Sequence, residues 1–347
     1  MPANEIFTAD NELIETVLHG YGICEPIAEI SELLRYVFSE TEIRLILKVS
    51  FASRNPVVIK FKNESDINAD VIEKQSAYAE LLAGNGIPVA RPFQDHGKYV
   101  TRISACGYEV YVTVEEFRDG EIQSVDLSTA YRTGELLAKT HDIAEKNDCH
   151  VDFPVLFDPF ESNDLFFVKE FEEMGAKLED EDRECFDRIM ERYHEHMECL
   201  LPLQTMEEYA VQGDISNNNL FVTNDGEIGL FDFNRCGDNN LFCDAIMQAV
   251  FEARLMDYPE ENEPTEFELL ENFLRGYQSI RPFRADEIER IPHLYAVISA
   301  FWGIDLIYDE EESLMKLLEK NDKLAVSKKL ADIKSKICFN LNVEYLR

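Results

Sequence analysis

Residues 211–244 read VQGDISNNNLFVTNDGEIGLFDFNRCGDNNLFCD, and the interpretation of the whole chain starts from this stretch. Asp214 precedes Asn219 by five residues, and Asp232 follows Asn219 by thirteen. Each of the two acids comes at the end of a short apolar run, YAV before the first and IGLF before the second. The pattern D-x-x-x-x-N alone is a weak signal, so its meaning depends on the structure predicted around it.

A β-hairpin is predicted between Asn219 and Asp232. Its arms are the apolar runs 220–222 and 228–231, and its turn is Asn-Asp-Gly at 224–226, a strong local hairpin signal. Because a hairpin returns its second arm beside the first, Asp232 is expected near Asn219.

This arrangement favours phosphoryl transfer to a hydroxyl group. Such chemistry needs a carboxylate that orients the acceptor hydroxyl and takes its proton, and oxygen ligands for Mg²⁺ on the nucleotide phosphates. Asp214 is the candidate catalytic carboxylate, and Asn219 and Asp232 are the candidate metal ligands. The competing interpretation is an Asn/Asp-rich turn between two ordinary strands.

The same stretch resembles the catalytic signature of the aminoglycoside phosphotransferase and choline kinase superfamily, which includes type II homoserine kinases and stress-response kinases. That signature is H-G-D-x-x-x-x-N, a hydrophobic hairpin, and then I/L-D-F/W. The chain has Gln212-Gly213-Asp214, Asn219 and Phe231-Asp232-Phe233. The resemblance also implies a later Asp that braces the loop, and Asp244 fits. Gln212 departs from the family's usual His, which mainly supports the loop.

The resemblance implies an α+β, bilobal, protein-kinase-like fold. We expect an antiparallel N-lobe sheet with one key helix in residues 1–114, a hinge at 115–120, and a mostly helical C-lobe at 121–347 that carries the catalytic loop and the acceptor site. The implied cofactors are ATP or GTP and Mg²⁺. The resemblance covers roughly residues 27–308, and it is specific only in the central stretch.

The composition limits the classes of partner. The chain has 347 residues, 33 Lys and Arg against 69 Asp and Glu, and a formal net charge of −36. This field repels phosphate backbones and anionic lipids, which argues against nucleic-acid and membrane-surface roles. It attracts a cationic small molecule, although an acidic surface for solubility or salt adaptation explains it equally well. The acidic N-terminus and the lack of a long apolar run predict a cytoplasmic protein.

The eight cysteines form no C-x-x-C pair, and scattered cysteines in a cytosolic chain are usually reduced core residues. His194 and His196 have no Cys or His partner at convincing ligand spacing. We therefore expect no zinc site.

The N-terminal third predicts an antiparallel meander with strands near 27–37, 42–51 and 57–61, followed by a helix near 66–83. Lys60 is the candidate lysine for the nucleotide phosphates, and Glu73 in the helix is its candidate partner. Lys48 and Lys62 compete for the lysine role, and Glu80 competes with Glu73.

Three further elements are assigned to the nucleotide site. The first hairpin has no glycine between residues 33 and 42, so Ser39 and backbone amides are the candidate phosphate contacts there. A further hairpin near 99–114 leads into the predicted hinge, where Glu115 and Phe117 are candidate nucleotide contacts; an ordinary loop is the alternative. Ser216 stands where typical Ser/Thr protein kinases carry Lys.

Helices are predicted for most of the remaining chain, including 126–147, where His141 is expected to be a packed structural residue. A helix over 285–308 is expected to break at Pro292. In the superfamily this region closes over the acceptor, so Glu252, Asp305 and Asp309 are candidate groups for substrate amines.

Three functions are weighed. The leading one is an ATP- and Mg²⁺-dependent phosphotransferase that acts on a hydroxyl of a small, amine-bearing molecule such as an aminoglycoside, an amino alcohol or homoserine. The second is a stress-response-type protein Ser/Thr kinase, against which stand Ser216 and the lack of an A-P-E anchor. The third is a catalytically degenerate kinase fold used for binding, supported only by Gln212 and the missing glycines. The acceptor and the oligomeric state cannot be read from the sequence.

Overall fold

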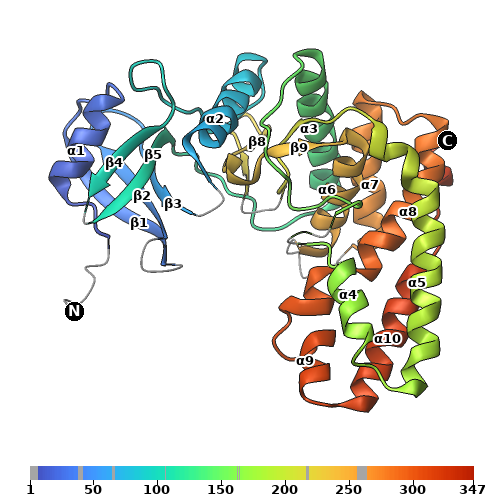
Figure 1. Ribbon diagram of the computed structural model, residues 1–347. Coiled ribbons are helices and arrows are strands. Elements are labelled where there is room, and N and C mark those ends of the chain that lie inside the picture. The colour runs from blue at the N-terminus through green and yellow to red at the C-terminus, as the bar shows by residue number, and fades with distance from the viewer. Residues whose placement is uncertain are drawn as a thin grey trace, which may run out of the picture. The chain divides into compact units, whose positions relative to one another are not determined.

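The computed structural model describes residues 7–37, 42–64, 67–105, 107–161, 163, 165–215, 219–255 and 264–347 (Figure 1). The chain forms two compact units. Unit 1 comprises residues 1–122, 149–153 and 218–236, and unit 2 comprises 123–148, 154–217 and 237–347. The hairpin of the central stretch therefore groups with the N-terminal residues, whereas the sequence prediction counted it within 121–347.

Unit 1 is built on a five-stranded antiparallel sheet in the order β1-β2-β3-β5-β4. The strands are β1 (Ile27–Val37), β2 (Ile43–Phe51), β3 (Val57–Asn63), β4 (Thr101–Ala105) and β5 (Tyr108–Glu116). This confirms the predicted meander. A two-stranded hairpin, β7 (Leu220–Val222) with β8 (Ile228–Leu230), completes the strands described in unit 1.

The two faces of the sheet have different neighbours because side chains alternate along each strand. Val57, Ile59 and Phe61 of β3 face a core that includes Ile14 and Leu18 of helix α1 (Asn11–Gly20). The side chains between them in the sequence, Val58, Lys60 and Lys62, face the other side. Helix α2 (Ala69–Gly84), capped by the Asn68 side chain at Val71 N, is the key helix expected in this unit.

Unit 2 is mostly helical, as predicted. Its helices are α3 (Leu127–Lys146), α4 (Val168–Gly175), α5 (Asp180–Leu200), α6 (Leu241–Leu255), α7 (Glu266–Ile280), α8 (Ala285–Ala300), α9 (Leu314–Glu319) and α10 (Lys323–Ile337). A short ribbon pairs β6 (Tyr209–Val211) with β9 (Gly237–Asn239). None of the described helices is long and apolar enough to cross a bilayer.

Helices α3 and α7 lie side by side (Figure 1), and glycines at their contact let them pack closely. A Cβ atom on Gly134 would lie 2.0 Å from the carbonyl oxygen of Phe273, and one on Gly276 would lie 1.8 Å from that of Tyr131. Both distances are far below van der Waals contact, so only glycine permits this approach. The close packing fixes α3, which carries His141, in the core of unit 2.

The predicted break at Pro292 is wrong. Helix α8 continues through Pro292 to Ala300, and a separate π-helical turn spans Ile304–Tyr308. Proline lacks the amide that would donate to the preceding turn, but it removes only that one hydrogen bond. The neighbouring Ile291 and Leu294 are fully buried, so packing keeps the helix intact.

Candidate active site

Lys60 lies at the centre of a buried charge cluster in unit 1. Its side chain is only 5% exposed, and its Nζ lies 2.8 Å from Glu115 Oε1 and 3.3 Å from Asp232 Oδ1. Burial disfavours the ammonium, but the two carboxylates outweigh this effect and raise the pKa of Lys60 above its ordinary value. The cluster therefore holds a permanent cation in a place shielded from water.

The hairpin delivers Asp232 as the sequence predicts. Leu220 pairs with Leu230, and Phe231 N donates to the carbonyl oxygen of Asn219, so Asn219 and Asp232 lie at the same end of the hairpin. Asp232 has a left-handed backbone with φ of 56°, an uncommon conformation for a residue other than glycine. Burial disfavours its carboxylate, but Lys60 more than compensates, and the pKa of Asp232 is lowered.

The three competing lysines have different partners. Lys48 Nζ lies 3.6 Å from the ring centroid of Phe117, a cation–π contact. Lys62 is buried, and its ammonium contacts the side-chain oxygen of Asn234. Lys60 is the lysine that meets Asp232.

Glu73 does not pair with Lys60, which corrects the prediction. Its carboxylate accepts hydrogen bonds from Tyr99 N and Val100 N at 3.0–3.1 Å. The rival Glu80 pairs with Arg91. Helix α2 turns Ile72, Gln75, Ser76 and Ala79 toward the lysines instead, so both glutamates lie about a quarter turn away. Spacing alone could not set this rotation.

The segment after Asp232 is held by Gln75, which the sequence did not single out, and by Lys62, a rival candidate for the nucleotide lysine. Gln75 Nε2 donates to the carbonyl oxygens of Asn234 at 3.1 Å and Cys236 at 2.9 Å. Lys62 contacts the side chain of the same Asn234, and burial together with Lys60 lowers the pKa of Lys62 to about 7. Helix α2 and strand β3 thus both fix the turn that starts at Asp232.

A cavity of about 400 Å³ lies next to this cluster within unit 1. The apolar side chains of Leu33, Ile46, Val58, Ala90 and Phe231 line it, together with Lys60, Glu115, Asp232 and the segment 116–121. The cavity combines apolar walls with a buried cation at one side, which suits a flat aromatic base joined to phosphates. Phe117, a predicted nucleotide contact, is among the residues that line the cavity.

The oxygen groups fit a magnesium ion. Mg²⁺ typically takes one or two protein carboxylates and fills its other positions with water and substrate phosphates. Asp232, whose side chain is 31% exposed, would supply a carboxylate, and Asn219 at the same end of the hairpin would supply an amide oxygen. Among the described residues no group of three or more His, Cys, Asp or Glu side chains forms a closed metal cage.

Asp214 lies in unit 2, at the end of β6. It follows Gly213, whose φ of 75° is a conformation that glycine adopts without strain. Asp214 N donates to Gln212 Oε1 at 2.8 Å, and Gln212 is fully buried. Gln212 therefore supports the loop that carries Asp214, a role the sequence analysis left to the missing His.

A chain of buried hydrogen bonds continues from this loop into the helices of unit 2. Ile215 N donates to Gln248 Oε1 at 2.8 Å, and Gln248 Nε2 donates to Asp244 Oδ1 at 3.0 Å. The second oxygen of Asp244 bonds His141 Nε2, and His141 Nδ1 bonds the Tyr277 hydroxyl, both at 2.9 Å. Asp244 thus braces the loop through Gln248, and His141 has the structural role predicted for it.

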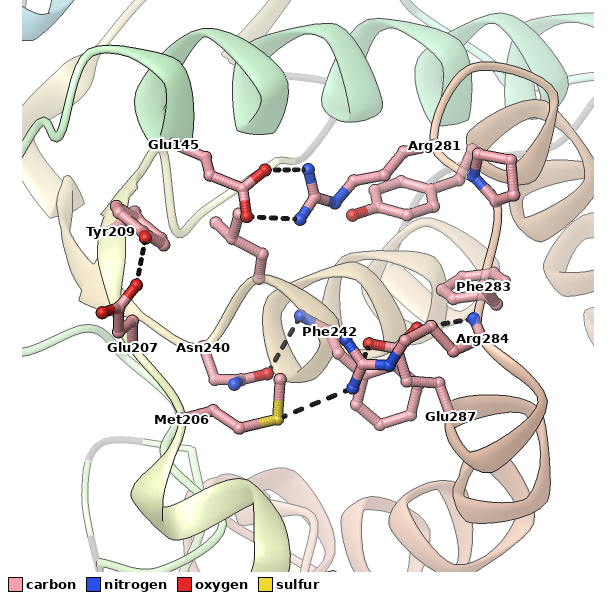
Figure 2. A pocket seen from close by; sticks show the side chains of 13 residues that line it. Glu145, Met206, Glu207, Tyr209, Asn240, Phe242, Arg281, Phe283, Arg284 and Glu287 are labelled. Atoms are coloured by element: carbon pink, nitrogen blue, oxygen red, sulfur yellow. Dashed lines mark hydrogen bonds and ion pairs between the residues drawn. The ribbon is translucent and has the colours of Figure 1, made fainter.

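A second cavity of about 190 Å³ lies within unit 2, and Tyr277 is among the residues that line it. Four of its charged side chains form two ion pairs (Figure 2). Arg281 makes a double contact with Glu145 at 2.7 and 3.0 Å, and Arg284 lies 3.1 Å from Glu287. Asp214 is not among the residues that line this cavity, and we therefore assign the cavity no part in the chemistry.

Of the candidate amine-binding acids, Glu252 is buried and Asp305 is paired, and two predicted nucleotide contacts lie outside the described residues. Glu252 is fully buried, and Asp305 is paired with Lys329 and Lys336. Neither is available to a substrate in this structure. Ser39 and Ser216 lie outside the described residues.

Comparison with known proteins agrees with this geometry. Residues 24–285 match the sequence pattern of the phosphotransferase enzyme family. The chain belongs to this family. No curated protein sequence matches the chain.

Solved structures of related phosphotransferases have the same fold. The amicoumacin kinase hAmiN, in complex with AMP-PNP, Ca²⁺ and Ami, has a TM-score of 0.58 and 15% identity, with 94% of each chain covered. A microcompartment-associated aminopropanol kinase has a TM-score of 0.59 and 15% identity, with 94% of this chain and 95% of that chain covered. The spectinomycin phosphotransferase APH(9)-Ia, in complex with ADP and spectinomycin, has a TM-score of 0.51 and 13% identity, covering 96% and 98%. At these identities the likeness establishes the bilobal, kinase-like fold that the sequence predicts.

Proposed function

We propose that this protein is an ATP- and Mg²⁺-dependent phosphotransferase that moves the γ-phosphate to a hydroxyl of a small, amine-bearing molecule. The observation that carries this proposal is the buried cluster of Lys60 and Asp232 beside a 400 Å³ cavity. Membership of the phosphotransferase family supports the reaction class. The net charge of −36 supports a cationic acceptor, because it raises the local concentration of cations and repels anions.

Each residue has a distinct role in this proposal. Lys60 contacts the nucleotide phosphates and neutralises negative charge as the phosphoryl group is transferred. Asp232 and Asn219 would hold the magnesium ion, which supplies further charge neutralisation when it is bound. Asp214 orients the acceptor hydroxyl and accepts its proton. Catalysis then depends mainly on positioning.

The test is a transfer assay with ATP or GTP, Mg²⁺, and a panel of aminoglycosides, amino alcohols, choline, homoserine and neutral sugars. We expect transfer to one amine-bearing acceptor, and its loss in Asp214→Asn. Transfer only to a neutral sugar would refute the amine requirement. No nucleotide binding and no turnover in the wild-type protein would refute the function itself.

A further inference from the structure

Of the two carboxylates that contact the buried Lys60, the closer one belongs to Glu115 on the neighbouring strand β5. Strands β3 and β5 are adjacent and antiparallel, with Lys60 opposite Thr113 and Val58 opposite Glu115. All four side chains line cavities on one face of the sheet. The Lys60–Glu115 contact of 2.8 Å is shorter than the Lys60–Asp232 contact of 3.3 Å, and Glu115 is only 17% exposed.

Helix α2 offers no alternative to Glu115. Its residues at the lysines are Ile72, Gln75, Ser76 and Ala79, and no acidic side chain of this fully described helix is among them. Glu73 is engaged with two backbone amides near Tyr99. In protein kinases the equivalent ion pair joins the strand lysine to a helix glutamate, so helix movement controls activity. That control needs a carboxylate on the helix.

We propose that Glu115 is the residue that positions Lys60 on the nucleotide phosphates, so that the lysine is held by the sheet and not by helix α2. The contact of Lys60 with nucleotide phosphates rests on the proposed function. The Lys60–Glu115 ion pair is observed independently of that function. Asp232 would also hold a metal ion in the proposed function, whereas Glu115 forms its ion pair with Lys60. Two hydrogen-bonded strands keep the pair assembled before any ligand arrives.

The first experiment measures Lys60 directly, without nucleotide or metal. An amine-acylating reagent reacts only with neutral lysine. Fragment-ion mass spectrometry reads acylation at Lys60 separately from Lys62, which lies on the same peptide and has a pKa lowered to about 7. Loss of the Glu115 charge makes the ammonium easier to deprotonate, so Glu115→Gln should speed acylation of Lys60 about tenfold or more. Glu73→Gln and Glu80→Gln each remove one carboxylate from helix α2 and should leave the rate unchanged.

The second experiment separates positioning from binding. Glu115→Gln keeps the shape of the side chain, so we expect kcat for transfer to fall about 10- to 100-fold while the nucleotide KM changes less than about threefold. Glu115→Asp, which keeps the charge, should recover part of kcat. Thermal unfolding of each variant shows whether it folds. If Glu115→Gln does not fold, the acylation rate of Lys60 in Glu115→Asp is compared with that in the wild-type protein instead.

The outcomes are distinguishable. Unchanged Lys60 acylation in Glu115→Gln, or a loss of kcat in Glu73→Gln that exceeds the loss in Glu115→Gln, would overturn the proposal. A wild-type protein that transfers no phosphate would refute the proposed function. In that case a faster acylation of Lys60 in Glu115→Gln would still establish that Glu115 holds the lysine.

Discussion

The two units bury polar groups by opposite means. In unit 1, Lys60 is neutralised by full charges on Glu115 and Asp232. In unit 2, the loop that carries Asp214 is held by amides, through Gln212 and Gln248, and the fully buried Glu252 has no ionic partner among the described residues. Unit 1 uses charge where charged phosphates and a metal ion would bind. Unit 2 uses uncharged contacts where the task is to orient a backbone.

This difference has an energetic consequence. Removing one member of a buried ion pair leaves a charge without its counter-charge, whereas removing an amide leaves only its hydrogen-bond partners unsatisfied. Substitutions in unit 1 should therefore be more costly than similar ones in the supporting chain of unit 2. Asp214 is the exception in unit 2, because its substitution is expected to change the reaction rate and not the stability.

The largest expected effect is that of Asp214→Asn. An amide cannot accept the proton of the acceptor hydroxyl, so kcat should fall about 10³-fold. The nucleotide KM should change little, because the proposed nucleotide contacts lie in unit 1. Steady-state transfer kinetics measure both constants. Asp225→Asn, in the exposed hairpin turn, is the matched control, and a loss of less than tenfold in Asp214→Asn would contradict the role of Asp214.

Lys60→Met tests the energetic importance of the buried charge cluster in unit 1. It leaves Glu115 and Asp232 close together without their cation, which should cost about 3–5 kcal/mol of unfolding free energy and abolish tight nucleotide binding. Urea denaturation and a nucleotide titration measure the two effects. Lys48→Met loses only a contact with Phe117 and should cost about 1 kcal/mol or less. Equal losses in both variants would show that the cluster has no special energetic weight.

The sequence predicted the parts of this site that depend on local patterns. The Asn-Asp-Gly turn and its apolar arms predicted the hairpin that carries Asn219 and Asp232. Lys60 and Asp232, 172 residues apart, were linked only through the resemblance to a family. The partner of Lys60 was misassigned because the rotation of α2 depends on distant contacts, such as Gln75 with Asn234 and Cys236. Gln248 could have been suspected, since it lies one helical turn after Asp244.

Glu252→Gln tests the buried groups of unit 2 through the pH dependence of stability. Burial raises the pKa of Glu252 from 4.5 to about 8, and the hydroxyl of the neighbouring Thr133 donates to Thr129 O instead. Between these pH values the unfolded chain releases the proton and the folded protein keeps it, so stability falls as pH rises. The loss from pH 5 to pH 8 should be on the order of 3 kcal/mol.

In Glu252→Gln that pH-dependent loss should disappear, as measured by urea denaturation at pH 5 and pH 8. Glu289→Gln, on the exposed side of α8, is the control and should keep the wild-type dependence. A Glu252→Gln variant with the full wild-type slope would mean that Glu252 is ionised in the folded protein.

Gln248→Leu breaks the chain between the loop and the helices. It removes the hydrogen bonds of Gln248 to Ile215 N and to Asp244 Oδ1 in the core, which should cost about 2 kcal/mol of stability, while Asp244 keeps its bond to His141. Because the amide of Ile215 adjoins Asp214, kcat should fall about tenfold with little change in the nucleotide KM. Gln204→Leu, an exposed glutamine of the same unit, controls for the chemical change. A stable variant with wild-type kcat would show that Gln212 alone orients the loop.

The smallest effect on stability is expected for an exposed ion pair whose N–O distance is as short as that of the buried pair at Lys60. Arg188 and Glu191 lie 2.6 Å apart on α5, closer than Lys60 and Glu115, yet their side chains are 57% and 55% exposed. Water and salt screen both charges, and ordering two long side chains costs entropy, so Arg188→Ala should change the unfolding free energy by less than about 0.5 kcal/mol. Urea denaturation at low and high salt measures it. A loss above about 1.5 kcal/mol would mean that distance, and not burial, sets the energy of ion pairs here, and the contrast drawn between the two units would no longer hold.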